Sequence, residues 1–254
     1  MQFIVIANPS RRQTFGNKGL FFLKKMIIKN IFWDVDGVLA DLNYAYFYFL
    51  KNHPKYATLY KNLKWEDLDK VLPINPKYGA LDLKCHPTLG DQMDYDFCHD
   101  LKFFENRPLY PDVIDTLRAL NKQGYRQFTL SASFDPEVKK RFLNKLLAPV
   151  TDFLTIECVG HGKFLHDTTK EGKFLECFQK YDVKPEETIL VDDRIYNMYA
   201  ALNVGVLPVR MRCPFTSDLP EELNWIHEVK NVKEVKSWLD EKGYASSFPG
   251  PRRK

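Results

Sequence analysis

Acidic side chains follow a short apolar segment near the start of the chain. Asp34 and Asp36 come directly after residues 27–33, and Gly37 is next. Residues two apart on an extended segment point the same way, so both carboxylates can face one site. Like charges this close need a compensating cation, and Mg²⁺ prefers oxygen ligands. A strand end closed by turn-forming Asp and Gly is the plain alternative.

A second acidic pair, Asp192 and Asp193, follows the apolar segment 188–191. One of the two can cap the helix that we expect next, which is the purely structural interpretation. Asn197 lies about one turn into that helix and is placed to support a metal site. The repetition of the pattern after two separate strands favours a shared metal centre.

Two further polar residues stand at the ends of predicted elements. Ser131 follows the predicted strand 125–130, where its hydroxyl can donate to a phosphoryl oxygen or simply close a turn. Lys170 begins a predicted helix over residues 170–181, and a lysine at that end opposes the helix dipole. This favours a functional position for Lys170, with Lys173 as the rival.

The elements that must position these residues alternate between strand and helix. We predict strands at residues 27–33, 125–130, 153–158, 188–191 and up to Val209, and helices from Pro111 to Gly124, from Asp135 to about Leu147, over 170–181 and over 232–242. Such alternation predicts an α/β fold with a doubly wound parallel sheet. Ligands of these sheets bind beyond the carboxyl ends of the strands, where the acidic pairs and Ser131 fall.

The whole pattern resembles the haloacid dehalogenase superfamily of phosphohydrolases. Residues 33–41 (WDVDGVLAD) are similar to its first motif, Ser131 to its second, Lys170 to its third, and residues 191–193 with Asn197 to its acidic fourth motif. The resemblance extends from about residue 29 to residue 209 with the motifs in the correct order. It is therefore more specific than any single motif.

The fourth and third motifs depart from the usual family pattern. Family members often have glycine where this chain has Asp192, and an acidic residue where it has Asn197. The lysine of the third motif often precedes a proline, which is absent after Lys170. These departures leave open whether Asp192 or Asp193 binds the metal, and whether Lys170 or Lys173 is the functional lysine.

The resemblance implies catalytic roles for four residues. Asp34 is expected to attack phosphorus and form an aspartyl-phosphate. Asp36 is expected to protonate the leaving oxygen and then to activate water. Ser131 and Lys170 are expected to bind the oxygens of the transferring group, where charge is spread in the transition state.

The implied cofactor is Mg²⁺. Its expected ligands are Asp34, the backbone carbonyl of Asp36, and Asp193 or Asp192. A halide leaving group needs no acid, so the presence of Asp36 favours phosphoryl transfer over dehalogenation. The sequence thus predicts a Mg²⁺-dependent phosphatase. A phosphotransferase or mutase of the same superfamily, or a non-catalytic binding protein that keeps the fold, are the alternatives.

The same resemblance divides the chain into a core and a cap. Residues 26–42 and 105–243 are expected to form the Rossmann-like core. Residues 43–104 are expected to form a mainly helical cap of the family's first type, with helices at 43–52 and 65–72 and a loop-rich part at 74–104. A cap of this size favours a small phosphorylated metabolite as the partner. Residues 1–25 are predicted to be an N-terminal extension and residues 244–254 a disordered tail.

Composition limits the other possibilities. The 254 residues carry a formal net charge of +4, with lysines spread along the chain, so we expect no nucleic-acid partner. No apolar run reaches the length of a membrane span, so we expect no membrane partner. Five scattered cysteines are not a disulfide framework, which favours a reducing, cytoplasmic location.

We expect no functional role for three further features. The adjacent pairs Cys85-His86 and Cys98-His99 are poorly spaced for one zinc ion. Residues 160–163 (GHGK) lack the full phosphate-loop spacing and are expected to be an ordinary loop. Arg194 is left outside the predicted site.

Overall fold

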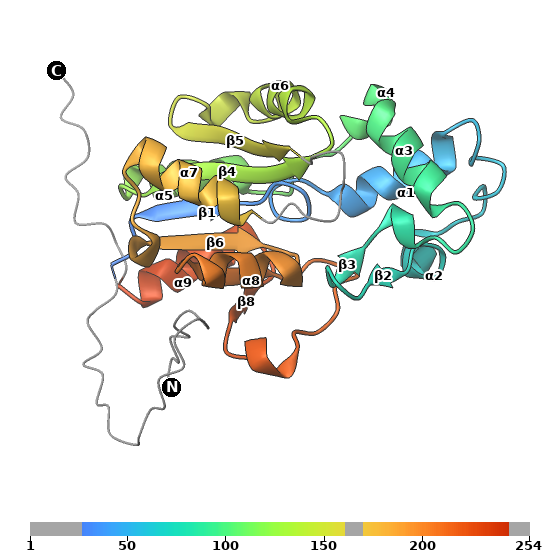
Figure 1. Cartoon of the computed structure of the whole chain (residues 1–254). Coiled ribbons are helices and arrows are strands. Elements are labelled where there is room, and N and C mark those ends of the chain that lie inside the picture. Colours follow the sequence, from blue (N-terminus) through green and yellow to red (C-terminus); the bar gives the residue numbers. More distant parts are fainter. Residues whose placement is uncertain (1–26, 161–169, 244–254) are drawn as a thin grey trace.

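A six-stranded parallel sheet forms the centre of the computed structural model, which describes residues 27–160 and 170–243 (Figure 1). Its strands are β1 (Asn30–Trp33), β4 (Arg126–Ser133), β5 (Leu154–Gly160), β6 (Thr188–Asp192), β7 (Leu207–Met211) and β8 (His227–Val229). They lie in the order β5-β4-β1-β6-β7-β8. From β1 the chain first builds outward through β4 and β5, and then through β6 to β8 on the other side. This confirms the predicted doubly wound α/β fold.

Helices cover both faces of the sheet. Buried residues of α5 (Val113–Lys122), α6 (Pro136–Leu146) and α9 (Val232–Glu241) pack against one face, and those of α7 (Glu171–Tyr181) and α8 (Ile195–Asn203) against the other. Strand β1 supplies both cores because successive side chains alternate: Ile31 and Trp33 join the first cluster and Phe32 the second. All three are fully buried, which explains why these three consecutive residues are all apolar.

Local signals explain the ends of several elements. Asp135 caps α6 by accepting hydrogen bonds from two backbone amides, and Pro136 occupies the first turn, as the sequence predicted. The strand predicted over residues 125–130 continues to Ser133. Strand β8 was not predicted, because three residues at the sheet edge with two polar side chains give no strand pattern.

The segment after β1 has a hydrophobic core of its own, and we call it the cap after the prediction. It contains α1 (Leu42–Asn52), α2 (Leu68–Val71), the hairpin of β2 (Ile74–Asn75) and β3 (Ala80–Leu81), α3 (Gly90–His99) and α4 (Leu101–Phe104). A cluster of buried residues from Leu42 to Phe103 fills it. In Figure 1 these elements lie to the right of the sheet, as expected for an insertion after the first strand.

The prediction that residues 74–104 are loop-rich is wrong in part. Helix α3 has ten residues, but within it only Gly90, Met93 and Phe97 are buried. Two large buried side chains four residues apart are too few to establish a helical period against the polar background. The exact core and cap boundaries of the sequence analysis stay predictions.

The cap hairpin contacts the core beside α8. The carbonyl of Tyr78 accepts a hydrogen bond from the amide of Ile195 at 2.9 Å, and the carbonyl of Gly79 accepts from the amide of Ser217 at 3.0 Å. Gly79 has φ of +69°, and a Cβ there would lie 2.6 Å from the side chain of Ile195. The hairpin therefore approaches the core as closely as a glycine permits.

Some predictions from the sequence fall on residues that the structure does not describe. Residues 1–25, the tail 244–254 and most of the loop 160–163 lie outside the described residues. All five cysteines lie within the described ranges and are free thiols, consistent with the absence of a disulfide framework. Within the same ranges, no helix combines the length and apolarity that a membrane span requires.

Candidate active site

The sheet register brings the predicted site residues to one edge. Trp33 of β1 pairs with Thr129 of β4 and with Val191 of β6. The amide of Asp34 then donates to the carbonyl of Val191 at 2.8 Å. Because β4, β1 and β6 are adjacent and parallel, Asp34, Ser131 and the second acidic pair meet at their carboxyl ends.

Three carboxylates form the acidic trio of Asp34, Asp192 and Asp193. One oxygen from each lies within 4.8 Å of the others, and all three residues are buried. Among the described residues this is the one group of three or more possible metal ligands. The Cys–His pairs of the cap form no such group. Buried carboxylate oxygens around one point are the donor set that a hard divalent cation such as Mg²⁺ requires.

The two carboxylates of the second pair have different surroundings. Asp192 accepts hydrogen bonds from Lys170 at 2.6 Å, from Asn197 at 3.0 Å and from the amide of Arg194 at 2.9 Å. Oδ1 of Asp193 is buried and has no hydrogen-bond partner among the described residues. A buried acceptor without a partner is unfavourable unless a ligand satisfies it. Asp193 therefore offers the oxygen that fits a metal, while Asp192 holds Lys170 and Asn197.

Gly37 explains how the β1 loop reaches Asp193. Its φ is +78°, and a Cβ at this position would lie 2.5 Å from Oδ2 of Asp193. Only glycine accepts both this backbone conformation and this contact without displacement. The glycine after the first acidic pair is thus needed to pack the two strand ends together.

Lys170 lies between two members of the acidic trio. Its Nζ is 3.0 Å from Oδ1 of Asp34 and 2.6 Å from Oδ2 of Asp192, and the side chain is almost fully buried. Lys173 instead pairs with Glu157 at 3.1 Å and Glu176 at 2.7 Å. The structure thus brings Lys170, and not Lys173, to the acidic trio.

Burial dominates the electrostatics of the trio. It raises the pKa of Asp34 to about 6, despite the opposing effect of Lys170. Burial also raises the pKa of Asp193 well above its ordinary value, although Arg194 opposes this. Burial alone would lower the pKa of Lys170, but Asp192 and Asp34 outweigh it and raise that pKa. Ionisation of Asp34 and Asp193 is therefore disfavoured despite Lys170, and a divalent cation would favour their ionised forms.

Two serine hydroxyls at the carboxyl end of β4 have no hydrogen-bond partner among the described residues. Ser131 is fully buried and Ser133 nearly so, and neither hydroxyl bonds any residue that the structure describes. Residues two apart on a strand share a face, so the two hydroxyls lie in line along the strand end. Ser131, level with the residue after Asp34, is placed to donate to a bound group.

The carboxylate of Asp36 lies outside the acidic trio. It forms ion pairs with Arg107 at 2.5 Å and with Lys139 at 2.6 Å, and we call these two residues the cation pair. Burial alone would raise the pKa of Asp36, but Arg107 and Lys139 outweigh it and hold that pKa far below its ordinary value. Burial and the nearby Arg107 lower the pKa of Lys139 to about 8.

The cation pair was not predicted from the sequence, and Arg194 was placed outside the predicted site. Lys139 carried a signal: it precedes Phe142 and Leu143 by three and four residues, and so shares the apolar face of α6. A lysine on such a face is rarely buried without a partner. Arg194 lies 5.0 Å from the ring of Tyr78, at the cap hairpin, and the nearby Asp193 contributes to its raised pKa, which burial opposes.

Solved structures of similar fold are numerous, although their sequences are distant. A predicted phosphatase from Clostridium acetobutylicum is 18% identical, with a TM-score of 0.57 over 85% of this chain and 99% of its own. A haloacid dehalogenase family hydrolase from Deinococcus radiodurans with bound phosphate and sodium is 13% identical, with a TM-score of 0.56 over 88% and 100%. A dehalogenase with an intermediate complex is 16% identical, with a TM-score of 0.56 over 83% and 96%.

At these identities the solved structures establish the fold alone, and they include phosphatases as well as dehalogenases. No curated protein sequence matches this chain significantly. The family comparison is more direct. The model of the haloacid dehalogenase-like hydrolase family matches residues 28–205, which is more than half of the chain and includes every motif described above. The chain therefore belongs to the haloacid dehalogenase-like hydrolases.

Proposed function

We propose that this protein is a Mg²⁺-dependent phosphatase that hydrolyses a small phosphorylated metabolite through an aspartyl-phosphate on Asp34. One observation carries the proposal. The buried carboxylate of Asp34 lies 3.0 Å from Lys170 and within the acidic trio beside Asp193, which has an unsatisfied oxygen, and the neighbouring strand β4 ends in the unsatisfied hydroxyl of Ser131. A phosphoryl group has oxygens that accept from the lysine and the serine, while its phosphorus faces Asp34.

The covalent steps follow from the positions of Asp34 and Asp36. An oxygen of Asp34 forms a bond to phosphorus as the bond between phosphorus and the ester oxygen breaks. Because its ion pairs with Arg107 and Lys139 keep Asp36 ionised, its carboxylate must leave these partners and take up a proton from water before it protonates the departing alcohol oxygen. A water molecule then attacks the aspartyl-phosphate and gives its proton to Asp36, which releases inorganic phosphate and restores Asp34.

Lys170 and Ser131 are the proposed electrostatic partners of the transferring group. Lys170 is anchored by Asp192, which in turn is held by Asn197, so its ammonium group is oriented before the substrate binds. Preorganised donors of this kind stabilise the charge that spreads over the phosphoryl oxygens in the transition state. A divalent cation held by Asp34, Asp193 and the backbone carbonyl of Asp36 would offset the repulsion between the nucleophile and the phosphate.

Phosphate ester hydrolysis is favoured over dehalogenation by Asp36. A halide departs as a stable anion and needs no proton. An alkoxide leaving group needs one, so an acid two residues from the nucleophile serves ester cleavage and not carbon–halogen cleavage. The buried cation pair on Asp36 holds this carboxylate at the site.

Hydrolysis of p-nitrophenyl phosphate tests the proposal. We expect the wild-type protein to release p-nitrophenol with Mg²⁺ and to stop when EDTA is added. Asp34→Asn is expected to lower kcat by at least about a thousandfold, because it removes the nucleophile. Asp115→Asn, which changes an exposed carboxylate on α5, is the matched control and should keep full activity.

Wild-type turnover by Asp34→Asn would refute the nucleophile assignment. Absence of Mg²⁺-dependent hydrolysis, for p-nitrophenyl phosphate and for a panel of phosphorylated metabolites alike, would refute the phosphatase. Comparing released phosphate with and without added sugar acceptors separates hydrolysis from phosphoryl transfer.

A further inference from the structure

We propose that the cation pair, Arg107 and Lys139, binds an anionic group in the leaving part of the substrate. The preferred substrates are then phosphate monoesters whose alcohol carries a carboxylate or a second phosphate. This inference rests on the proposed function, because it concerns the group that departs from phosphorus. It goes beyond that function by naming the chemistry that the cap and core select.

The cation pair places two buried positive charges on one carboxylate. The side chain of Arg107 is 3% exposed and that of Lys139 is fully buried. Both pair with Asp36, so this group of three has an excess of one positive charge. In addition, Nε of Arg107 is buried and bonds no residue within the described ranges. The pair therefore has binding capacity that Asp36 does not use.

The geometry of the ion pairs adds a second reason. Each oxygen of Asp36 is already used by one cation, so this single carboxylate cannot neutralise both. An uncompensated buried charge is strongly unfavourable. An anion on the substrate would compensate the remaining positive charge, and a neutral leaving group would not.

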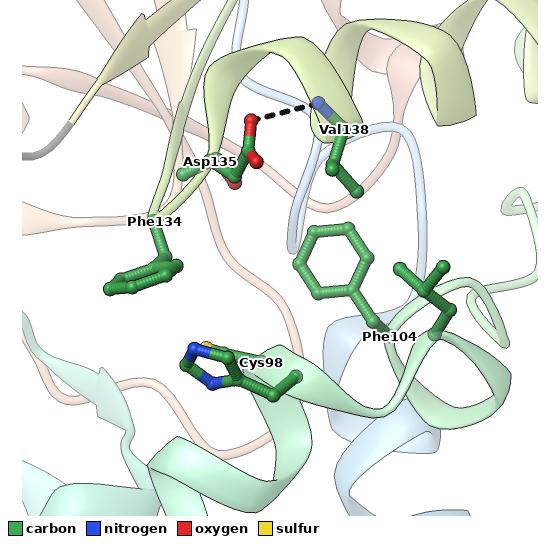
Figure 2. A pocket seen from close by; sticks show the side chains of 8 residues that line it. Cys98, Phe104, Phe134, Asp135 and Val138 are labelled. Carbon is green, nitrogen blue, oxygen red and sulfur yellow. Dashed lines mark hydrogen bonds between the residues drawn. The ribbon is translucent and has the colours of Figure 1, made fainter.

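A cavity beside the cation pair offers room for the rest of the substrate. It measures about 150 Å³ and lies between α3 and α4 of the cap and the β4–α6 connection of the core (Figure 2). Its lining residues are Cys98, His99, Leu101, Phe104, Ser133, Phe134, Asp135 and Val138. In Figure 2 the rings of Phe104 and Phe134 stand on either side of it. Because both cap and core line it, this cavity is suited to select the substrate.

Phe104 separates the cavity from the cation pair and contacts both. The ring of Phe104 lies 4.3 Å from the guanidinium of Arg107 and 5.5 Å from Nζ of Lys139, so this residue links the cavity wall to the cation pair. Ser133 brings its unsatisfied hydroxyl to the cavity, two residues beyond Ser131. A space of about 10–15 Å³ suffices for one water, so the cavity accommodates a small organic group.

Three matched three-carbon esters test the inference. Propyl phosphate has a neutral leaving group, 3-(phosphonooxy)propanoate adds a carboxylate, and propane-1,3-diol bisphosphate adds a second phosphate. With Mg²⁺ at fixed ionic strength, we expect kcat/KM to be at least tenfold higher for one or both anionic esters than for propyl phosphate. The two anionic arms distinguish a carboxylate from a phosphate as the bound group.

Substitution of the cation pair should remove the preference. In Lys139→Met and in Arg107→Gln we expect the ratio of kcat/KM between anionic and neutral esters to fall to about one, whatever happens to the absolute rate. Lys140→Met is the matched control, because the neighbouring lysine of α6 is exposed. It should keep the wild-type ratio. A ratio that falls only in the two substitutions of the cation pair cannot then result from a general loss of positive charge.

Binding to the Asp34→Asn protein separates this inference from the proposed function. Calorimetry with Mg²⁺ should give a Kd at least tenfold lower for an anionic ester than for propyl phosphate, even if no ester is hydrolysed. Equal affinities for all three esters would overturn the inference, and so would a wild-type protein that prefers propyl phosphate. Loss of p-nitrophenyl phosphate hydrolysis with an intact affinity ratio would instead overturn the phosphatase.

Discussion

Asp34→Asn is expected to stabilise the metal-free protein while it abolishes activity. The buried carboxylate of Asp34 has a pKa of about 6, against an ordinary value of 3.8. Because the folded state prefers the protonated form, ionisation of Asp34 opposes folding. This opposition is absent below pH 3.8, grows as the pH rises to 6, and is complete above it.

The magnitude follows from the pKa. A rise from 3.8 to about 6 corresponds to about 3 kcal/mol, since one pKa unit is worth 1.36 kcal/mol. Asparagine resembles the neutral carboxyl group and removes this penalty, and the favourable effect of Lys170 on the ionised form is already contained in the pKa of about 6. At about 2–4 °C per kcal/mol for a chain of this size, we expect Asp34→Asn to raise the Tm by about 6–12 °C at pH 7.5.

Thermal unfolding in EDTA and in Mg²⁺ measures this effect. In EDTA the variant should melt above the wild type at pH 7.5, with a smaller difference at pH 4.5. A ligand at one hundred times its Kd stabilises a protein by about 2.7 kcal/mol, so saturating Mg²⁺ should remove the advantage by stabilising the wild type alone. Asp115→Asn, on the surface, should match the wild type in both conditions.

Two results would refute this reasoning about Asp34. One is a variant that melts below the wild type in EDTA at pH 7.5, because ionised Asp34 would then not destabilise the folded state. The other is an equal Mg²⁺ effect on the variant and the wild type, because the metal would then not use this carboxylate.

Three further predictions concern the same site. Gly37→Ala should lower stability by about 1–3 kcal/mol in a denaturant titration and weaken Mg²⁺ activation, because its Cβ meets Asp193 at 2.5 Å. Asp193→Asn should raise the Mg²⁺ concentration for half-maximal activity at least about tenfold, since metal affinity depends on charged oxygen ligands. Lys170→Met should lower kcat by about 10²–10³ while Lys173→Met leaves it within about threefold, as steady-state assays will show.

The parts of the site carried by strand ends were predictable from the sequence. Asp34, Ser131 and Asp192 each follow a predicted strand, and parallel strands bring their carboxyl ends to one edge. The sheet and the helices of the core were also predictable, from the hydrophobic pattern of each segment. The hydrophobic period is strong there because each helix of the core packs one face on the sheet.

Other features depend on side-chain directions that spacing does not determine. Asp192 and Asp193 are adjacent, and the sequence could not tell which one keeps a free oxygen. The structure distinguishes them because Asp192 turns toward Lys170 and Asn197 at the start of α8. Arg107 was equally hidden, since it reaches Asp36 across 71 residues of sequence.

The distribution of charge over the site connects these observations. The acidic trio has three carboxylates around Lys170, so its side of the site is short of positive charge. Asp36 pairs with both Arg107 and Lys139, so the other side of the site has an excess of positive charge. Mg²⁺ would correct the first side, and an anion on the leaving group would correct the second. A phosphate ester with a second anionic group is therefore the ligand whose charges match both halves at once.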